Sequence, residues 1–423
     1  MGSIGPTLVA AENQETIKPL NRIDRAVKVL IADKLSETVS SSLQALGLEV
    51  ESRPELSAED IPEALDGVGV LIVRSTRVTA AAMEQANNLA LVIRAGAGVN
   101  TIDLPSASAR GIYVTNCPGK NTAAVAELAV GLLIAADRQI VDATITLREG
   151  SWQKKRFGAS RGLRGRTLGI LGFGAIGQAV AARAAGLGME VCVWSRSLSS
   201  KVEQDLGIEV VDSPIEVARM SDAVSVHLAL CEETRGLIDK NFFAALKPGA
   251  IFVNTARGEL VDTPALLEAL TAKQLRVGLD VFEEEPSGGT ADFAETDLAR
   301  SIVCTPHIGA STGEASEAIA AEVVHIVEVY LKTGHPPVTV NLCARSNATC
   351  HLVVRHYNRV GVLASILDGL RSQEINVEQM DNVIFDGEHA ACCTLLLSQE
   401  PSEKFMAFLK AEEAILHVAL RRE

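Results

Sequence analysis

Short apolar runs alternate with polar, helix-like stretches through the first part of the chain. The runs VKVLIA (27–32), GVLIV (69–73) and LALVIRAG (89–96) predict strands with helices between them. A longer amphipathic stretch without proline, residues 122–148, predicts one long helix. Six further apolar runs follow: TLGILG, MEVCVW, AVSVHL, AIFVNTA, RVGLDVF and SIVCTP. Runs that are apolar on both faces predict parallel sheets covered by helices on each side.

A second long amphipathic stretch, residues 313–332, ends at the stop signal Gly334-His335-Pro336-Pro337. With the helix expected over 122–148 it brackets the middle strands, so the chain is expected to leave one domain, build a second and return. We therefore expect two Rossmann-like, doubly wound parallel-sheet domains after an N-terminal tail. The predicted parts are a tail (1–26), a discontinuous substrate-binding domain (27–120 and 306–342) and an inserted dinucleotide-binding domain (121–305).

The pattern changes again near the C-terminus. Strand-like CHLVVR, helix-like GVLASILDGLRSQ and strand-like INVEQMDNVIF come first, and then a turn at Asp386-Gly387. Strand-like AACCTLLLS, helix-like EKFMAFLKA and strand-like ILHVALRR follow. This order of strand, helix, two strands, helix and strand predicts a small ferredoxin-like α+β domain over residues 347–423.

Length and charge narrow the function classes. A chain of 423 residues fits two or three domains, and no apolar run approaches the roughly 18 residues of a membrane span. The eight cysteines are scattered without a C-x-x-C pair, and the first residues do not resemble a signal peptide, so we expect a cytoplasmic protein without a metal site. The formal net charge of −14 argues against nucleic acid or an anionic membrane as partner.

A glycine-rich turn marks a nucleotide site. The sequence Gly172-Phe173-Gly174-Ala175-Ile176-Gly177 follows the strand-like TLGIL and opens a helix-like stretch. Glycines at this spacing allow a tight turn, close approach of a pyrophosphate to the backbone, and packing of the helix on the strand. The pattern favours a dinucleotide cofactor over a purely structural turn because strand, turn and helix stand in the required order.

The cofactor's adenosine ribose is expected at the end of the next strand, MEVCVW. An acidic residue commonly stands there, about 20 residues beyond the glycines, but this chain has Ser195 and Arg196. A hydroxyl and a guanidinium suit a 2′-phosphate better than a free diol, so the sequence slightly favours NADP over NAD. The alternative is that Arg196 is a solvated cation beside the adenine.

Three residues that suit hydride transfer at a 2-hydroxy acid follow three strands of the middle sheet. Arg257 follows AIFVNTA, Glu285 follows LDVF, and His307 follows SIVCT. The carboxyl ends of parallel strands share one edge of a sheet, so we expect the three side chains to converge. A cation can fix a carboxylate and polarise a C=O group, an imidazole can exchange a proton near neutral pH, and a carboxylate can orient the imidazole.

The strings VNTARGELVD, GLDVFEEEP and TPHIGAST resemble the three signatures of the D-isomer-specific 2-hydroxyacid dehydrogenases. The resemblance extends from about residue 27 to the C-terminus. It implies that Arg257, Glu285 and His307 are the catalytic residues, and that Asp280 holds the nicotinamide carboxamide. It also implies a nicotinamide cofactor, NAD(P).

Strings in the first domain resemble the 3-phosphoglycerate dehydrogenases of this family. VRSTRVT places Arg74 and Ser75 at a phosphate-binding position, and RAGAGVN places Ala97, Gly98 and Val99 in a carboxylate-binding loop. NCPGKNTAAVAE adds Asn121. The resemblance implies oxidation of 3-phosphoglycerate to 3-phosphohydroxypyruvate, the first step of L-serine biosynthesis. The alternatives are an NADPH-dependent hydroxypyruvate or glyoxylate reductase and a non-enzymatic dinucleotide-sensing scaffold.

The C-terminal string HLVVRHYNRVGVLASILDGLRSQEINVEQMDNV resembles an ACT domain, a ligand-binding regulatory unit. The resemblance implies an L-serine effector bound by His356, Asn358 and Asn376, and a homo-oligomer in which these domains pair. Val360 departs from the family pattern, which has proline there, and leaves the entry to the first helix less rigid. The alternative is that the domain only joins subunits.

Overall fold

The computed structural model describes residues 27–196, 198, 208–286, 291–343 and 346–422, so the expected tail, residues 1–26, lies outside the described residues. Contacts divide the chain into two compact units, Met1–Asn341 and Leu342–Glu423. Within the described residues, no helix combines the length and the apolar character that crossing a membrane requires.

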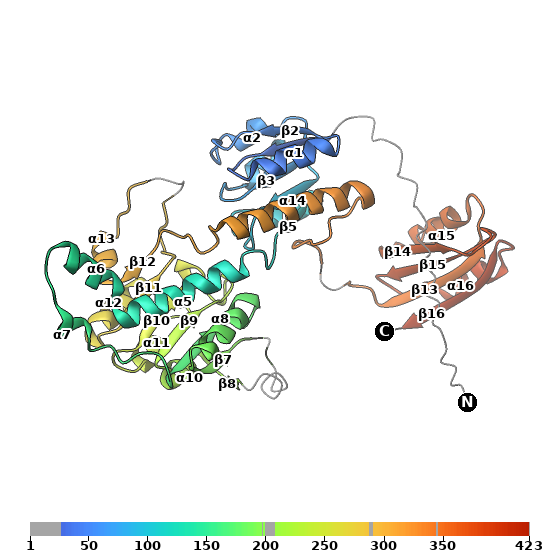
Figure 1. Cartoon of the computed structure of the whole chain (residues 1–423). Helices are drawn as coiled ribbons and strands as arrows, with labels where there is room; N and C mark the ends of the chain where they lie inside the picture. The colour runs from blue at the N-terminus through green and yellow to red at the C-terminus, as the bar shows by residue number, and fades with distance from the viewer. Residues whose placement is uncertain (1–26, 197, 199–207, 287–290, 344–345, 423) are drawn as a thin grey trace, which may run out of the picture. The chain divides into compact units, whose positions relative to one another are not determined.

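The first unit begins with a five-stranded parallel sheet in the order β2-β1-β3-β4-β5. Its strands are β1 (Lys28–Ile31), β2 (Glu49–Ser52), β3 (Val68–Val73), β4 (Leu91–Arg94) and β5 (Tyr113–Asn116). One face packs against α1 (Glu37–Ala45) and the long α14 (Gly313–Thr333), which lies along this sheet in Figure 1. The other face packs against α2 (Ile61–Ala64), α3 (Ala80–Gln85) and α4 (Leu104–Ala109).

A seven-stranded parallel sheet follows, in the order β12-β11-β10-β9-β6-β7-β8. Its strands are β6 (Thr167–Leu171), β7 (Glu190–Trp194), β8 (Glu209–Val210), β9 (Ala223–Val226), β10 (Ile251–Asn254), β11 (Arg276–Leu279) and β12 (Val303–Cys304). Helices α5 (Thr122–Arg138) and α8 (Ala175–Gly186) cover one face, and α10 (Pro214–Met220), α11 (Lys240–Ala245) and α12 (Thr263–Ala272) cover the other. The predicted parallel sheets with helices on both faces are confirmed.

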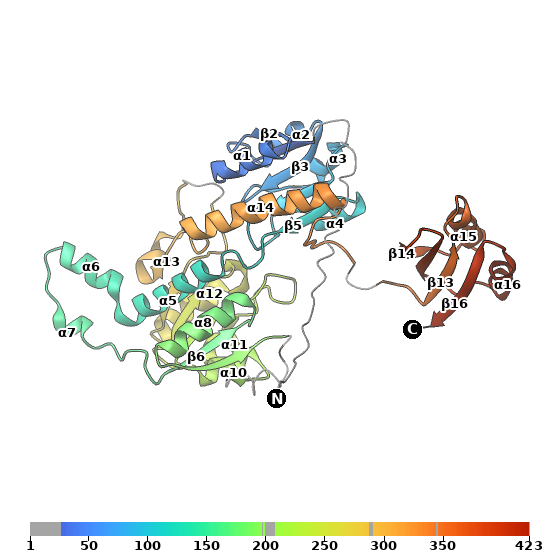
Figure 2. The same ribbon diagram turned by 45° about the vertical axis from the view of Figure 1, so that its right-hand side comes forward.

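The prediction of one helix over residues 122–148 is wrong. Helix α5 ends at Arg138, Gln139 takes a left-handed conformation (φ 50°, ψ 44°), and α6 (Ile140–Arg148) begins after it. A left-handed residue cannot continue a right-handed helix, so the chain turns there. Helix α6 and the short α7 (Lys154–Phe157) extend away from the sheet in both views (Figures 1 and 2). The second predicted long helix is confirmed as α14, which ends at left-handed Gly334.

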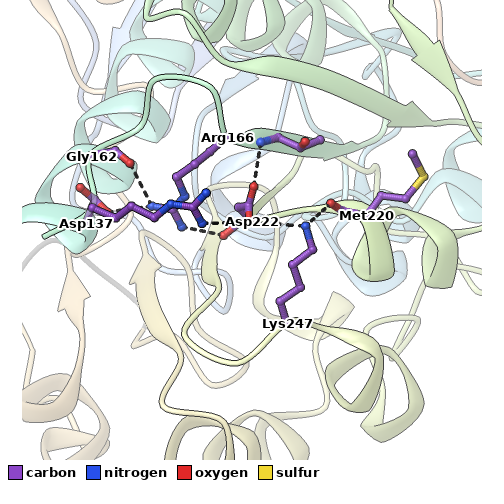
Figure 3. A network of polar contacts seen from close by, with 8 residues as sticks. Asp137, Gly162, Arg166, Met220, Asp222 and Lys247 are labelled. Carbon is purple, nitrogen blue, oxygen red and sulfur yellow. Dashed lines mark hydrogen bonds and ion pairs between the residues drawn. The ribbon is translucent and has the colours of Figure 1, made fainter.

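A network of charged side chains links the elements at the amino-terminal ends of the strands in the second sheet (Figure 3). Buried Asp137, in the last turn of α5, accepts a hydrogen bond of 2.8 Å from Arg166, which directly precedes β6. Arg166 also donates to the carbonyl of Asp222, and the Asp222 carboxylate accepts from the backbone of Thr167. Lys247 lies 3.4 Å from the same carboxylate. This network lies at the sheet edge opposite to the carboxyl ends of the strands, where the candidate site lies.

The second unit is a four-stranded antiparallel sheet in the order β14-β15-β13-β16. Its elements are β13 (Cys350–Tyr357), α15 (Val362–Arg371), β14 (Val377–Ile384), β15 (Ala390–Leu397), α16 (Glu403–Ala411) and β16 (Ile415–Arg422). The alternating buried and exposed positions of β13 and β15 place one face of the sheet in a core with both helices. The predicted order of strands and helices is confirmed.

Candidate active site

A short hydrogen bond joins the predicted histidine and glutamate. His307 Nδ1 lies 2.6 Å from Glu285 Oε2, and Phe282 donates its backbone N–H to the other carboxylate oxygen at 3.1 Å. Burial alone would raise the pKa of Glu285, but the hydrogen bond and charge of His307 outweigh burial and hold that pKa below its usual value. Glu285 is therefore a carboxylate near neutral pH, so His307 donates from Nδ1 and its Nε2 is the nitrogen left to exchange a proton.

The loop that carries His307 is fixed by Asp280. His307 has a left-handed backbone (φ 52°), which is unusual for a residue other than glycine. Asp280, only 1% exposed, accepts hydrogen bonds from the Thr305 hydroxyl (2.6 Å) and the N–H groups of Ile308 (2.8 Å) and Gly309 (2.8 Å). Its carbonyl also accepts from the His307 N–H. Both carboxylate oxygens thus hold the loop, and the predicted contact of Asp280 with a carboxamide stays a prediction.

Arg257 reaches from the second sheet to the predicted carboxylate-binding loop of the first. Its guanidinium lies 3.4 Å from the Asn100 side-chain oxygen, and a Cβ at Gly98 would overlap it. Burial lowers the pKa of Arg257, while the nearby charge of Glu285 acts in the opposite direction. The structure therefore brings Arg257, Glu285, His307 and the Gly98 loop together.

Gly258 allows the loop that carries Arg257 to contact the loop that leads to Glu285. It follows Arg257 directly, and a Cβ at this position would overlap the backbone of Phe282 and Glu283. Its backbone is therefore in close contact with the loop that leads to Glu285. The sequence contained this glycine in the string TARGEL, but only the structure shows what it approaches.

The glycine-rich turn fits a dinucleotide. Gly172 has φ 93°, and a Cβ there would overlap the His227 carbonyl, while a Cβ at Gly177 would overlap the Gly172 carbonyl. Gly174, by contrast, faces open space, and as the N-cap of α8 it offers no side chain to the first-turn N–H groups of Ala175 and Ile176. A pyrophosphate at this position would accept hydrogen bonds from these groups and benefit from the helix dipole.

The predicted 2′-phosphate position carries an ion pair. Arg196, after β7, lies 3.6 Å from Glu233 and 3.5 Å from the sulfur of Cys231, both in the loop after β9. Strands β7 and β9 flank β6, so this pair lies beside the glycine-rich turn. Both side chains are more than half exposed, which makes the pair weak and sensitive to salt. Ser195 also makes an interaction, so this residue is not without a partner.

A third arginine, missed by the sequence analysis, joins Arg74 and Arg257. Arg94 ends β4, next to the strand that leads to Arg74, and its guanidinium lies over Gly96. Burial, with the positive charges of Arg257 and Arg74, lowers the pKa of Arg94 to about 10. Its Nε is buried without a hydrogen-bond partner among the described residues. An unpaired, repelled cation of this kind favours an anionic ligand.

The remaining predicted substrate residues differ in their surroundings. Ser75 is exposed, and Ala97 accepts a hydrogen bond of 2.5 Å from the Asn116 side chain. Asn121 is the N-cap of α5, and its side-chain oxygen is buried without a partner among the described residues. Val99 contributes its carbonyl to the turn that precedes Ile102. The unpartnered oxygens of Asn116 and Asn121 mark polar surface that water or a ligand must satisfy.

The three predicted effector residues do not meet within one chain. His356 is 2% exposed, with its ring nitrogens near the Tyr357 carbonyl (2.8 Å) and Asn382 (3.3 Å). Asn358 donates to the Glu388 carbonyl at the same end of the sheet. Asn376 directly precedes β14. The first residue of β14, Val377, pairs with Leu397 of β15, and Leu397 in turn pairs with Cys350 at the far end of β13. The two ends of β13 are about 20 Å apart.

Comparisons with known proteins show which family this chain resembles. Residues 130–309 match the model of the family described as D-isomer specific 2-hydroxyacid dehydrogenase, NAD binding domain. The chain is 43% identical over 280 residues to a hydroxypyruvate reductase of Thermotoga maritima, covering 66% of this chain and 89% of that protein. It is 39% identical over 308 residues to the D-3-phosphoglycerate dehydrogenase of Methanocaldococcus jannaschii, covering 72% of this chain and 58% of the relative.

A solved structure extends the likeness to the fold. The TT0316 protein of Thermus thermophilus superposes with a TM-score of 0.67 at 34% identity, covering 74% of this chain and 100% of that one. The chain spans less than two thirds of the length of the archaeal 3-phosphoglycerate dehydrogenases that it matches.

Proposed function

The chain belongs to the D-isomer specific 2-hydroxyacid dehydrogenase family, and we propose that it oxidises a small anionic 2-hydroxy acid with a nicotinamide dinucleotide. The first sheet with α14 (27–120 and 306–342) would bind the substrate, and residues 121–305 would bind the dinucleotide. The bound nicotinamide would accept the hydride from C2. Within the described residues, no cluster of three or more His, Cys, Asp or Glu side chains suits a metal ion, and none of the proposed roles needs one.

The chain's own residues supply binding and proton transfer. His307 takes the hydroxyl proton at Nε2, while Glu285 holds Nδ1–H and stabilises the imidazolium. Arg257 binds the substrate carboxylate and the oxygen at C2, where negative charge develops if the hydroxyl proton leaves ahead of the hydride. The 2.6 Å bond between His307 and Glu285 supports these roles because it fixes which imidazole nitrogen faces the substrate.

We propose 3-phosphoglycerate as the substrate, oxidised to 3-phosphohydroxypyruvate in the first step of L-serine biosynthesis. The observation that carries this choice is the grouping of three arginines, in which buried Arg94 lies close enough to Arg74 and Arg257 to be repelled by both. A substrate with one carboxylate needs one of these cations, whereas a substrate with a carboxylate and a phosphate can engage all three. The similarity to the 3-phosphoglycerate dehydrogenases supports the same choice.

A second candidate is an NADPH-dependent hydroxypyruvate or glyoxylate reductase. Two observations favour it: Arg196 at the 2′-phosphate position and the similarity to a hydroxypyruvate reductase. The test is one assay panel with both cofactors and with 3-phosphoglycerate, D-glycerate, hydroxypyruvate and glyoxylate. We expect kcat/KM to be highest for 3-phosphoglycerate. Higher kcat/KM for glyoxylate and hydroxypyruvate, with NADPH, would select the reductase instead.

We further propose that the second unit is an ACT-type domain that binds L-serine between two copies of the chain. His356 and Asn358 lie at one end of its sheet and Asn376 at the other, so only a second copy could complete the set. Edge strand β14 exposes Met380, Val383 and Ile384, apolar groups that a paired strand would cover. Helix α6 exposes Ile140, Ile145 and Leu147, which also supports a homo-oligomer.

A further inference from the structure

One carboxylate holds the backbone of the loop that carries Arg74. Asp33 directly follows Ala32 at the end of β1, and its Oδ2 accepts hydrogen bonds from three consecutive N–H groups. The distances are 2.6 Å to Arg74, 3.1 Å to Ser75 and 3.0 Å to Thr76. The Thr76 hydroxyl donates a fourth hydrogen bond, to the Ala32 carbonyl at 3.3 Å. The loop therefore has little freedom to rotate where the Arg74 side chain leaves it.

Position along the chain explains why the sequence did not indicate this contact. Strands β1 and β3 are neighbours in the sheet although more than forty residues separate Asp33 from the three amides. Their carboxyl ends lie side by side, so a side chain that follows β1 can reach the backbone that follows β3. Nothing local to VRSTRVT identifies the partner of its N–H groups.

We propose that Asp33 is a positioning residue that holds the Arg74 loop and thereby sets the preference for phosphorylated over unphosphorylated substrates. The inference rests on the proposed function, which gives Arg74 a phosphate to bind. Because these three N–H groups already donate to Asp33, they are not available to the phosphate, so the loop would bind it through the Arg74 side chain. If the loop were free to move, ordering Arg74 on binding would cost conformational entropy, and the affinity for the phosphorylated substrate would be lower.

Charge gives Asp33 a second effect on the same site. Its carboxylate lies close enough to Arg94 to favour the charged guanidinium, against the repulsion from Arg74 and Arg257. A neutral amide could still accept hydrogen bonds from the loop, but it would not supply this counter-charge. Asp33→Asn therefore tests charge with a similar shape, and Asp33→Ala removes both the charge and the acceptor.

Asp60 provides a matched control in the same part of the chain. Its Oδ2 also holds a local backbone, accepting from the Ser57 N–H at 2.9 Å and the Ser57 hydroxyl at 2.6 Å. No residue of the candidate site is among these partners. Asp60→Asn makes the same chemical change at a carboxylate that binds a different loop, one that does not carry Arg74. It therefore measures the general effect of weakening a contact between a carboxylate and a loop backbone.

The experiment measures binding of 2-phosphoglycolate and of glycolate to the full chain by calorimetry, with the reduced dinucleotide present so that glycolate, itself a 2-hydroxy acid, is not oxidised. Wild type should bind 2-phosphoglycolate more tightly than glycolate. Asp33→Asn should weaken 2-phosphoglycolate about five- to twentyfold, part of what a charge-assisted hydrogen bond is worth, and Asp33→Ala somewhat more. Glycolate affinity should change less than about twofold, and Asp60→Asn should leave both affinities within about twofold of wild type.

Each outcome decides between the two proposals. Equal weakening of both ligands in Asp33→Ala, unchanged binding of 2-phosphoglycolate, or no preference for it in wild type overturns the role of Asp33. A wild type that prefers 2-phosphoglycolate but does not oxidise 3-phosphoglycerate overturns the proposed function and leaves the role of Asp33 standing. Unaltered dinucleotide affinity in every variant, read from nicotinamide fluorescence, shows that the variants fold.

Discussion

Replacing Arg94 by methionine should stabilise the free protein while damaging its use of a phosphorylated substrate. The pKa of Arg94 is lowered from the ordinary value of a guanidinium to about 10, chiefly by burial. This shift corresponds to at most about 3–4 kcal/mol of unfavourable free energy in the charged form. Arg94 keeps some contact with solvent, so we expect Arg94→Met to raise the unfolding free energy by about 1–2 kcal/mol.

The pH dependence fixes the sign of this effect. A cation with a folded pKa below its unfolded pKa destabilises the fold while it is charged, and this penalty is fully present below about pH 10. The penalty fades as pH rises above about 10, through the range in which the folded protein loses the Arg94 proton before the unfolded chain does. The gain from Arg94→Met should therefore be constant between pH 7 and pH 9. A rise in Tm of a few degrees is the expected size.

Thermal unfolding at pH 8, without and with 3-phosphoglycerate, measures the stability of the free protein and its stabilisation by the ligand. The ligand should raise Tm of the wild type and have much less effect on Arg94→Met, whose KM for 3-phosphoglycerate should rise at least about tenfold. Exposed Arg77→Met is the control, and it should change neither quantity appreciably. A lower Tm of the ligand-free Arg94→Met, or an unchanged KM, would refute the argument that Arg94 is repelled by its neighbouring arginines and binds an anion.

Three further predictions address the other parts of the site. His307→Ala should lower kcat about a hundred- to ten-thousandfold and leave dinucleotide affinity nearly intact, and near-normal turnover would contradict its role as the base. Glu233→Gln should raise kcat/KM for NADP relative to NAD about three- to tenfold at low salt, because it removes the charge that pairs with Arg196, and Glu232→Gln at the neighbouring exposed position is the control. L-Serine should bind and inhibit wild type at millimolar concentration but not Asn358→Ala. Calorimetry that detects no binding to wild type would remove the serine effector.

The parallel strands of the fold were predictable where they are buried on both faces. The runs that became β1, β3 and β4 stand out because nearly every residue is apolar. Edge strand β2, with the sequence EVES, and the two-residue β8 have no such run, so pattern alone could not find them. Burial on two faces leaves a signal in the sequence, and an edge strand leaves much less.

The break between α5 and α6 was not predictable from periodicity. Both helices have an apolar stripe, so the pattern continues across Gln139. Glutamine has no special preference for the left-handed conformation that it takes there, in contrast to Gly334 at the end of α14. The break follows from the environment, because α5 packs on the second sheet while α6 extends beyond it.

Candidate site residues were predictable from one topological rule, and the residues that were missed follow from the same rule. Arg257, Glu285 and His307 were placed together because each follows a strand of the second sheet, and parallel strands end at one edge. In the first sheet, β1, β3 and β4 are neighbours, and Asp33, Arg74 and Arg94 stand at their carboxyl ends. The family-like strings assigned a role to Arg74 but not to Arg94, although Arg94 is the first residue of RAGAGVN, because a motif is read along the chain. The counter-charge and the third arginine come from strands adjacent only in space, so their roles depend on strand order, which the sequence did not provide.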